Sequence, residues 1–135
     1  MRDPIERLIY QSRALWPAPE NALDSILATS VGANARSGVT GALGFSGASY
    51  VQLLEGSPQA LDALMGKLLA DPRHTDLVVL TRSSAGARLV PGWSMARVDL
   101  AQVSPRVSSL LANGDGLGLM NLMANLVHGG FTDVV

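Results

Sequence analysis

The chain has 135 residues and a formal net charge of −1, from ten Lys and Arg against eleven Asp and Glu. This size predicts one domain, and the charge balance lacks the basic excess that nucleic-acid binding requires. The absence of cysteine excludes disulfides, thiolate metal sites and cysteine nucleophiles. No apolar run approaches the ~20 residues of a membrane span, and residues 1–13 lack the apolar stretch of a signal peptide. We therefore expect a cytoplasmic protein that contacts neither membrane nor nucleic acid.

The composition is apolar for so small a chain. Hydrophobic residues make up 47% and charged residues 16%, and the mean hydropathy is +0.25. A small monomer has too little interior to hide that much apolar surface, so the composition predicts a partner or a self-association face.

The first half of the chain predicts a strand, a helix and a hairpin. Ile5–Arg13 is typical of a strand, and Glu20–Val31 has apolar residues at helical spacing. Val39–Phe45 and Ser49–Glu55 are two further strands. The short glycine-containing turn 46–48 joins them, which predicts a hairpin.

The second half predicts a helix, two strands and two tail helices. Gln59–Leu69 has an apolar helical face, and the Asp-Pro pair that follows ends it. Asp76–Thr81 is a continuous apolar strand, a kind that is usually covered on both faces, and a loop is expected over Ser83–Gly86. Gly92–Val98 predicts a fifth strand. The tail holds two helical patterns, Ser104–Ala112 and Leu117–Val127.

This order of elements predicts an α+β, ferredoxin-like βαββαβ fold with a five-stranded mixed sheet. Two helices are expected on one face, and the pair of C-terminal helices on the opposite face. The first and third strands become central neighbours, so Tyr10 and Gln52 can point side by side at the face that the first two helices cover. Ile9, Val51 and Leu53 then lie on the opposite face, which only the tail helices remain to cover.

Several polar residues have both a structural and a functional interpretation. Gln52 interrupts an apolar strand, either as a buried amide with partners or as an outward-facing residue that water satisfies. Tyr10 is either a core tyrosine or a functional one, and Asn34 can cap a helix or form a turn. Trp93 and Met95 share one strand face and would ordinarily fill a core.

No enzyme motif stands out. The segment that contains His74 resembles a helix stop with a solvated charge pair, and one histidine without a second ligand makes a poor metal site. The chain lacks a nucleophile elbow, a P-loop, a Rossmann glycine pattern and paired carboxylates. A small acylphosphatase-like enzyme would need an N-terminal phosphate-binding loop, and residues 11–19 do not resemble one.

Five segments together resemble the BLUF family, the flavin-binding domains that sense blue light. They are LIYQSRA at Leu8–Ala14, NARSGVTGAL at Asn34–Leu43, YVQLLEG at Tyr50–Gly56, DPRHTD at Asp71–Asp76, and GWSM at Gly92–Met95. Their order and spacing follow the family pattern, and the resemblance covers about Arg7 to Arg97. It implies that FAD binds non-covalently between the first two helices.

The resemblance also implies roles for individual residues. Tyr10 matches the photoactive tyrosine, Gln52 the glutamine between that phenol and the flavin, and Asn34 the asparagine that binds the flavin's pyrimidine edge. Trp93 and Met95 match the pair that relays the signal along the fifth strand. Further positions that line the flavin in relatives are Ser30, Ile26, Leu43, Lys67, Leu68, Asp71, Arg73 and His74.

These matches predict a photoreceptor and not an enzyme, with a photosensory core over residues 1–98 and a C-terminal helical output segment over 99–135. Light would drive electron and proton transfer from Tyr10 and rearrange the Gln52 amide. The signal would then pass through the fifth strand and the C-terminal helices to a separate effector protein.

The C-terminal segment predicts a second kind of partner, which is another copy of the chain. Because Leu117–Val127 is apolar nearly all round, we also expect a homo-oligomer through the C-terminal helices. The sequence departs from the family pattern at Ala33, at Gly44, where a bulky apolar residue is usual, and at 89–91. The alternative function is therefore a photochemically inactive BLUF-like interaction module.

Overall fold

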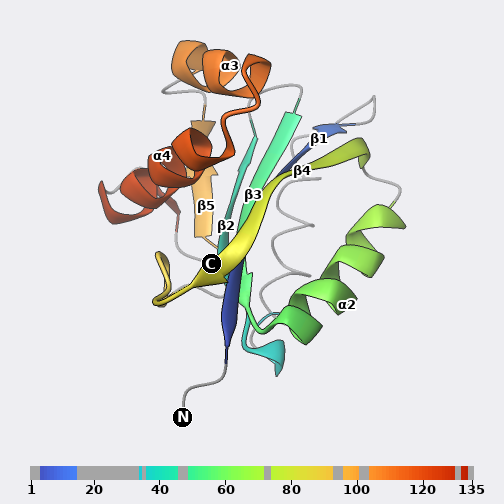
Figure 1. Cartoon of the computed structure of the whole chain (residues 1–135). Coiled ribbons are helices and arrows are strands. Elements are labelled where there is room, and N and C mark those ends of the chain that lie inside the picture. The colour runs from blue at the N-terminus through green and yellow to red at the C-terminus, as the bar shows by residue number, and fades with distance from the viewer. Residues whose placement is uncertain are drawn as a thin grey trace.

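The structure, a computed structural model, describes residues 4–14, 34, 36–45, 49–71, 74–92, 96–100, 104–129 and 132–133. Within these ranges six strands form one sheet in the order β4-β1-β3-β2-β5-β6. The strands are β1 (Ile5–Ala14), β2 (Thr40–Phe45), β3 (Ser49–Gly56), β4 (His74–Ala85), β5 (Ala96–Asp99) and β6 (Thr132–Asp133). The helices are α2 (Pro58–Leu69), α3 (Ser104–Ala112) and α4 (Gly116–Gly129). Figure 1 shows α2 on one side of the sheet and α4 on the other.

The α+β class that the sequence predicts is confirmed, and the sheet is mixed, because β2 and β5 run parallel while the other pairs are antiparallel. The described sheet has six strands and not five, since the two-residue β6 adds to the outer side of β5. The helix predicted over Glu20–Val31 lies outside the described residues. The ferredoxin-like arrangement, which needs that helix, therefore stays a prediction.

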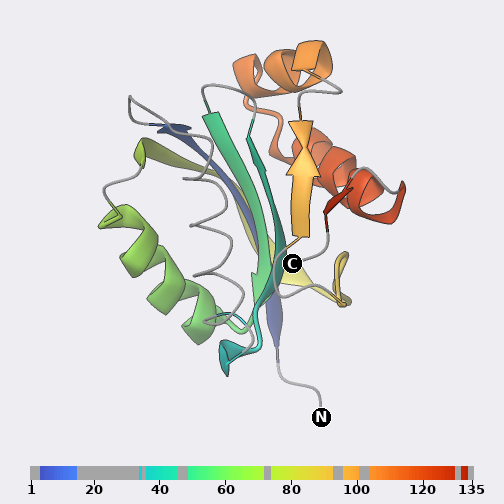
Figure 2. The same ribbon diagram turned by 180° about the vertical axis from the view of Figure 1, so that it is seen from behind.

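The central strands β1 and β3 divide the core into two layers. On the α2 side, Leu8, Tyr10 and Leu54 pack with apolar residues of α2, including Leu61. On the α4 side, Ile9, Val51 and Leu53 pack with Leu119, Met123 and other residues of α4. Figure 2, the view from behind, shows the same separation of α2 from α4 by the sheet. The predicted division of the two faces is confirmed, because successive side chains of a strand point to opposite sides.

Helix α2 begins one residue before the predicted start. Ser57 is the N-cap, where its hydroxyl accepts a hydrogen bond from the Ala60 amide at 3.1 Å, and Pro58 occupies the first turn, where no amide proton is needed. Leu61, Met65 and Leu68 are its buried residues, and their spacing turns one face of the helix to the sheet.

Helix α4 uses its apolar surface inside the chain. The Asp115 carboxylate accepts a hydrogen bond from the Gly118 amide at 2.8 Å in its first turn. The residues buried along it are Leu119, Met120, Leu122, Met123, Ala124, Leu126 and Val127. The sheet and α3 cover them, and Leu117, 65% exposed, is the large apolar residue left at its surface. The second apolar face expected for a partner subunit is therefore not presented by this helix.

The tail helices also differ from each other in position. Helix α4 lies across the sheet, whereas α3 packs mainly on α4 and sits at one end of the sheet (Figure 1). Val107 of α3 joins the same core as the α4 residues. Both tail helices were predicted on the opposite face of the sheet. In the structure α4 covers that face, whereas α3 lies at the end of the sheet.

The exposure of strand β4 contradicts the prediction that this strand is covered on both faces. A strand covered on both faces was expected over Asp76–Thr81, but β4 is the sheet edge and pairs with β1 alone. Val78 is 49% exposed and Val79 is 43% exposed. The strand also continues to Ala85, so the loop expected over Ser83–Gly86 begins later. A run of apolar residues does not by itself distinguish an edge strand from a central one.

Among the described residues, no helix is long and apolar enough to cross a membrane. The division at residue 98 falls inside β5, so it remains a prediction about function and not a visible boundary.

Gly44 leaves room for a neighbouring leucine. A Cβ at this position of β2 would lie 2.6 Å from the side chain of Leu100, which is fully buried just after β5. Leu100 thus fills the space that a bulkier residue on β2 would occupy, which accounts for this departure from the family pattern.

We expect Gly44→Ala to lower the free energy of unfolding by about 1–3 kcal/mol, because the added methyl overpacks this contact. Combined with Leu100→Ala, the loss should be smaller than the sum of the two single losses. Urea unfolding measures these differences. Gly66→Ala is the control, since no atom lies within 4 Å of the added Cβ and alanine favours the helix by about 0.5–1 kcal/mol. Additive losses at residues 44 and 100 would contradict the contact.

Candidate functional site

The phenol of Tyr10 donates a hydrogen bond to Oε1 of Gln52 inside the protein. The two residues are direct partners in the antiparallel register of β1 and β3, and both are almost fully buried. Directly opposite residues on one face of such a pair have Cβ atoms about 5 Å apart, which brings phenol and amide into contact. The sequence expectation that these side chains lie side by side is confirmed.

Burial keeps the Tyr10 phenol protonated. Loss of hydration raises its pKa above the ordinary value of 10.0, and the Asp71 carboxylate and Tyr50 raise it further. Removing a proton would leave a negative charge in a dry interior, which is costly. Tyr10 therefore keeps a transferable proton at every pH near neutrality, and its partner amide is uncharged as well.

His74, at the start of β4, joins the end of α2 to β1. Its Nε2 lies 2.7 Å from the carbonyl oxygen of Leu68, and its Nδ1 lies 2.6 Å from Oγ of Ser12. Because a carbonyl can only accept, Nε2 donates, and in the neutral ring Nδ1 accepts from the Ser12 hydroxyl. The imidazole also stands edge-on to Tyr10, with ring centroids 6.2 Å apart.

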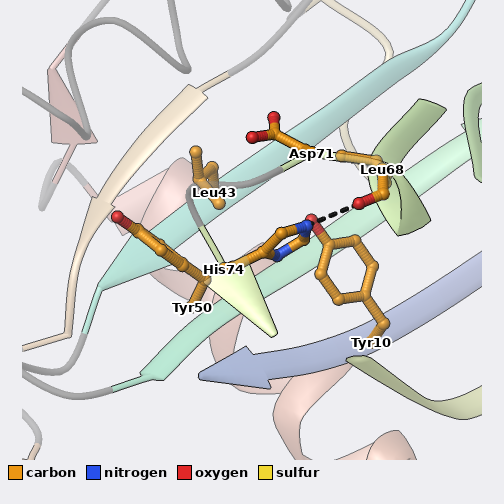
Figure 3. A pocket seen from close by; sticks show the side chains of 6 residues that line it. All are labelled: Tyr10, Leu43, Tyr50, Leu68, Asp71 and His74. Atoms are coloured by element: carbon orange, nitrogen blue, oxygen red, sulfur yellow. Dashed lines mark hydrogen bonds between the residues drawn. The ribbon is translucent and has the colours of Figure 1, made fainter. Parts of the chain in front are cut away.

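A small pocket lies between these groups. Its lining residues are Tyr10, Leu43, Tyr50, Leu68, Asp71 and His74 (Figure 3). They come from β1, β2, β3, α2 and β4, and Asp71 comes from the segment between α2 and β4. The volume of the pocket is about 10 Å³, close to the space of one water molecule. The surface of the pocket is mainly apolar, and its polar groups come from the two tyrosine phenols, the His74 imidazole and the Asp71 carboxylate.

A second, polar pocket begins at Ser12. It measures about 220 Å³, and the residues that line it are Gln11, Ser12, Arg13, Ser49 and Asp76. The pairing of β1 and β4 is irregular between Gln11 and Arg13, and Asp76 adopts a φ of 54°. The Ser12–His74 hydrogen bond thus links the polar pocket to the apolar one.

The structure brings most of the described candidates together. Leu43, Leu68, Asp71 and His74 line the pocket with Tyr10, and Gln52 bonds to that tyrosine. Asn34 is buried before β2, where its backbone carbonyl accepts a hydrogen bond from the Val39 amide at 3.0 Å. It is not among the residues that line this pocket. Lys67 is exposed on α2. The remaining candidates lie outside the described residues: Ile26, Ser30, Arg73, Trp93 and Met95.

Sequence reasoning missed two members of the site. Tyr50 lines the pocket, and Ser12 bonds to His74. Each lies two residues from a predicted site residue on the same strand, Tyr50 from Gln52 and Ser12 from Tyr10. The period of two that placed the pair on the α2 face would also have found these neighbours.

No metal site accompanies the pocket within the described ranges. No group of three or more His, Asp or Glu side chains is clustered there.

The raised pKa of Tyr10 predicts a pH-dependent stability. Below pH 10 the phenol is protonated in both states, and its contribution is complete. Above pH 10 the unfolded phenol loses its proton while the buried one keeps it, so the free energy of unfolding falls by up to about 1.4 kcal/mol per pH unit. Urea unfolding between about pH 8 and pH 11 should show a steeper decline for the wild type than for Tyr10→Phe. Equal slopes would contradict the assignment.

The comparisons with known proteins agree with this geometry. The family model "Sensors of blue-light using FAD" (BLUF) matches residues 5–96. The solved structure "BlrB - a BLUF protein, dark state structure" has a TM-score of 0.80 and 31% identity, over 92% of this chain and 98% of that one.

Two relatives from curated proteins are similar over the same region. "Photoactivated adenylate cyclase subunit alpha" of Euglena gracilis is 31% identical over 111 residues, which is 79% of this chain and 11% of the relative. "Blue light- and temperature-regulated antirepressor BluF" of Escherichia coli (strain K12) is 32% identical over 93 residues, 69% of this chain and 23% of the relative. The chain thus spans less than a quarter of either relative's length. With a family model that covers most of its residues, and with the phenol–amide pair at the centre of its sheet, this chain belongs to the BLUF family of blue-light sensors that use FAD.

Proposed function

We propose that this chain is a blue-light receptor that binds FAD non-covalently at the Tyr10 pocket and signals by rearranging the Gln52 amide. The observation that carries the proposal is the buried hydrogen bond between the Tyr10 phenol and the Gln52 amide. The description of the BLUF family is that of blue-light sensors that use FAD, which supports a sensory function.

The residues of the pocket suit a flavin ring. Leu43 and Leu68 offer apolar walls to a flat aromatic system, and the phenol–amide pair offers hydrogen bonds at its edge. Asn34 is assigned to the pyrimidine edge, and Ile26, Ser30, Lys67, Asp71, Arg73 and His74 are assigned to the rest of the flavin by their positions in the family pattern.

Bound flavin supplies a strong oxidant when it absorbs blue light. Tyr10 is the donor, because its phenol is neutral, buried and held on the Gln52 carbonyl. On illumination its electron would pass to the excited flavin while the hydroxyl proton moves along the hydrogen bond to Oε1 of Gln52. The electron and the proton would then both return to Tyr10, so that neither the tyrosine nor the flavin is left oxidised or reduced. The lasting change is in the Gln52 amide, which has a donor end and an acceptor end and can exchange them without burying a charge.

The signal leaves through the sheet toward the C-terminal helices and then to a separate effector. Trp93 and Met95 are assigned to the relay by their match to the family pattern. Relatives bear the names of an adenylate cyclase subunit and an antirepressor, so the same sensor accompanies different outputs. Self-association through the C-terminal helices stays a prediction. The apolar residues of α4 are buried within the chain, so this helix offers little apolar surface to a second copy.

Tyr10→Phe and Gln52→Leu should each abolish the reversible red shift of the flavin band while FAD stays bound, because each variant removes one end of the donor–amide hydrogen bond. Absorption spectra of the FAD-loaded chain before and after blue light measure the shift, and the ratio of flavin to protein absorbance measures binding.

Tyr50→Phe is the matched control. It removes a phenol from the same pocket but leaves the Tyr10–Gln52 bond intact, so its red shift should persist. A Tyr10→Phe or Gln52→Leu chain that still shifts would show that the residue lacks the role proposed for it. A wild-type chain that takes up no FAD would overturn the function itself.

A further inference from the structure

The buried carboxylate of Glu55 holds the Ala87–Val90 loop, which lies between β4 and β5, against the central strand β3. Its Oε1 accepts from the Leu89 amide at 2.8 Å and from the Val90 amide at 2.9 Å. Its Oε2 accepts from the Leu89 amide at 2.8 Å and from Arg7 Nε at 2.9 Å. Glu55 itself is 0% exposed.

Such a group fixes the loop in one position. A buried carboxylate is tolerated only when hydrogen bonds and an opposite charge replace its lost hydration. Here two backbone amides of the loop and one guanidinium of β1 do so, and charge-assisted hydrogen bonds are stronger than neutral ones. A displacement of β3 at Glu55 must therefore either move the loop or break these bonds.

Two arginines strengthen the same junction. Arg7 Nη2 donates to the Ala87 carbonyl at 2.6 Å, so this side chain reaches both Glu55 and the loop. Arg88 Nη1 donates to the Glu55 carbonyl at 3.0 Å and to Thr40 Oγ1 at 2.9 Å, which ties the loop to β3 and β2.

The other side of the loop bonds to α4. Nε2 of His128, in the last turn of that helix, lies 2.7 Å from the Leu89 carbonyl oxygen and donates to it. The backbone amide of Leu89 therefore donates a hydrogen bond to Glu55 of β3, and its carbonyl oxygen accepts one from His128 of α4. Val90 packs in the same core as Leu126 and Val127 near the end of α4.

Strand β3 carries Gln52 and Glu55 three residues apart, on opposite faces. Gln52 meets Tyr10 on the α2 face, whereas Glu55 faces the loop on the α4 side. Strand β3 thus carries Gln52, the partner of Tyr10, and Glu55, which bonds to the loop. Among the described residues, the hydrogen bond from His128 to Leu89 joins that loop to the last turn of α4.

From this we infer that Glu55 is a positioning residue of the light response, which couples the position of β3 to the C-terminal end of α4 through Leu89 and His128. The inference rests on the proposed function, since light acts on β3 through Gln52. The hydrogen bonds of Glu55 and His128 with Leu89 carry the change across the sheet, from the α2 face to helix α4 on the other side.

Hydrogen–deuterium exchange of the FAD-loaded full chain, in darkness and under blue light, tests this coupling. In the wild type, illumination should change exchange in residues 86–92 and in residues 116–129. In Glu55→Gln the charge is lost and an NH2 group can face the loop amides, so the flavin red shift should persist while both exchange differences disappear. A role in folding alone would leave the light-dependent difference in α4 unchanged.

Two further variants locate the effect. His128→Ala changes an exposed side chain and should keep the red shift and the response of 86–92 but lose the response of 116–129. Glu6→Gln is the matched control, because that carboxylate lies on β1 and pairs with Arg82 instead of the loop, so both responses should remain.

The outcomes separate this inference from the proposed function. A wild type that shows the red shift but no exchange difference in 116–129 overturns the inference alone, as does a full α4 response in Glu55→Gln or His128→Ala. If Glu55→Gln does not fold, His128→Ala decides by itself. A wild type without a red shift overturns the proposed function first, and this coupling with it.

Discussion

The antiparallel register of β1 and β3 is the constraint on which the rest of the site depends. It sets Tyr10 opposite Gln52 and Leu8 opposite Leu54 on one face, and it leaves Ile9 for the other. A slip by one residue would turn the phenol toward α4 and bring apolar side chains to the pocket. Because both faces are buried, such a slip would disrupt two cores at once, and the register is strongly specified.

The two faces of β3 hold different kinds of polar group. Toward α2 the polar pair is neutral, phenol and amide, so its hydrogen bonds can exchange without moving a full charge through a dry interior. Toward α4 the polar group is the Glu55 carboxylate with Arg7, which resists rearrangement because any broken bond leaves a buried charge uncompensated. The neutral Tyr10–Gln52 pair can change its hydrogen bonds, whereas the charged Glu55–Arg7 pair keeps them. This combination suits a strand that would transmit small displacements from one face of the sheet to the other.

The apolar composition of the chain is explained largely from within. Helix α4 covers the face of the sheet that α2 leaves open, and α3 covers part of α4, so the apolar tail serves as the second core layer. A light signal that reaches α4 would consequently shift a packed helix and its hydrogen bond to Leu89. It would not act through an apolar surface of α4 that is already exposed, because the apolar residues of α4 other than Leu117 are buried. The longer relatives place similar sensor sequences within much larger chains.

The sequence by itself determined the described elements other than the two-residue β6, the division of β1 and β3 residues between two faces, and the family, because alternation and five ordered motifs are local properties of the chain. It also pointed to Tyr10, Gln52 and His74. Only the tertiary structure decided that β4 lies at the sheet edge, that Leu100 fills the space beside Gly44, and that Glu55 holds a loop 34 and 35 residues further along the chain. Those outcomes depend on which segments meet in space. The contact between Tyr10 and Gln52 follows from the strand order and from the alternation of side chains along each strand, but neither periodicity nor composition predicts which side chain fills a gap or which loop packs against a strand.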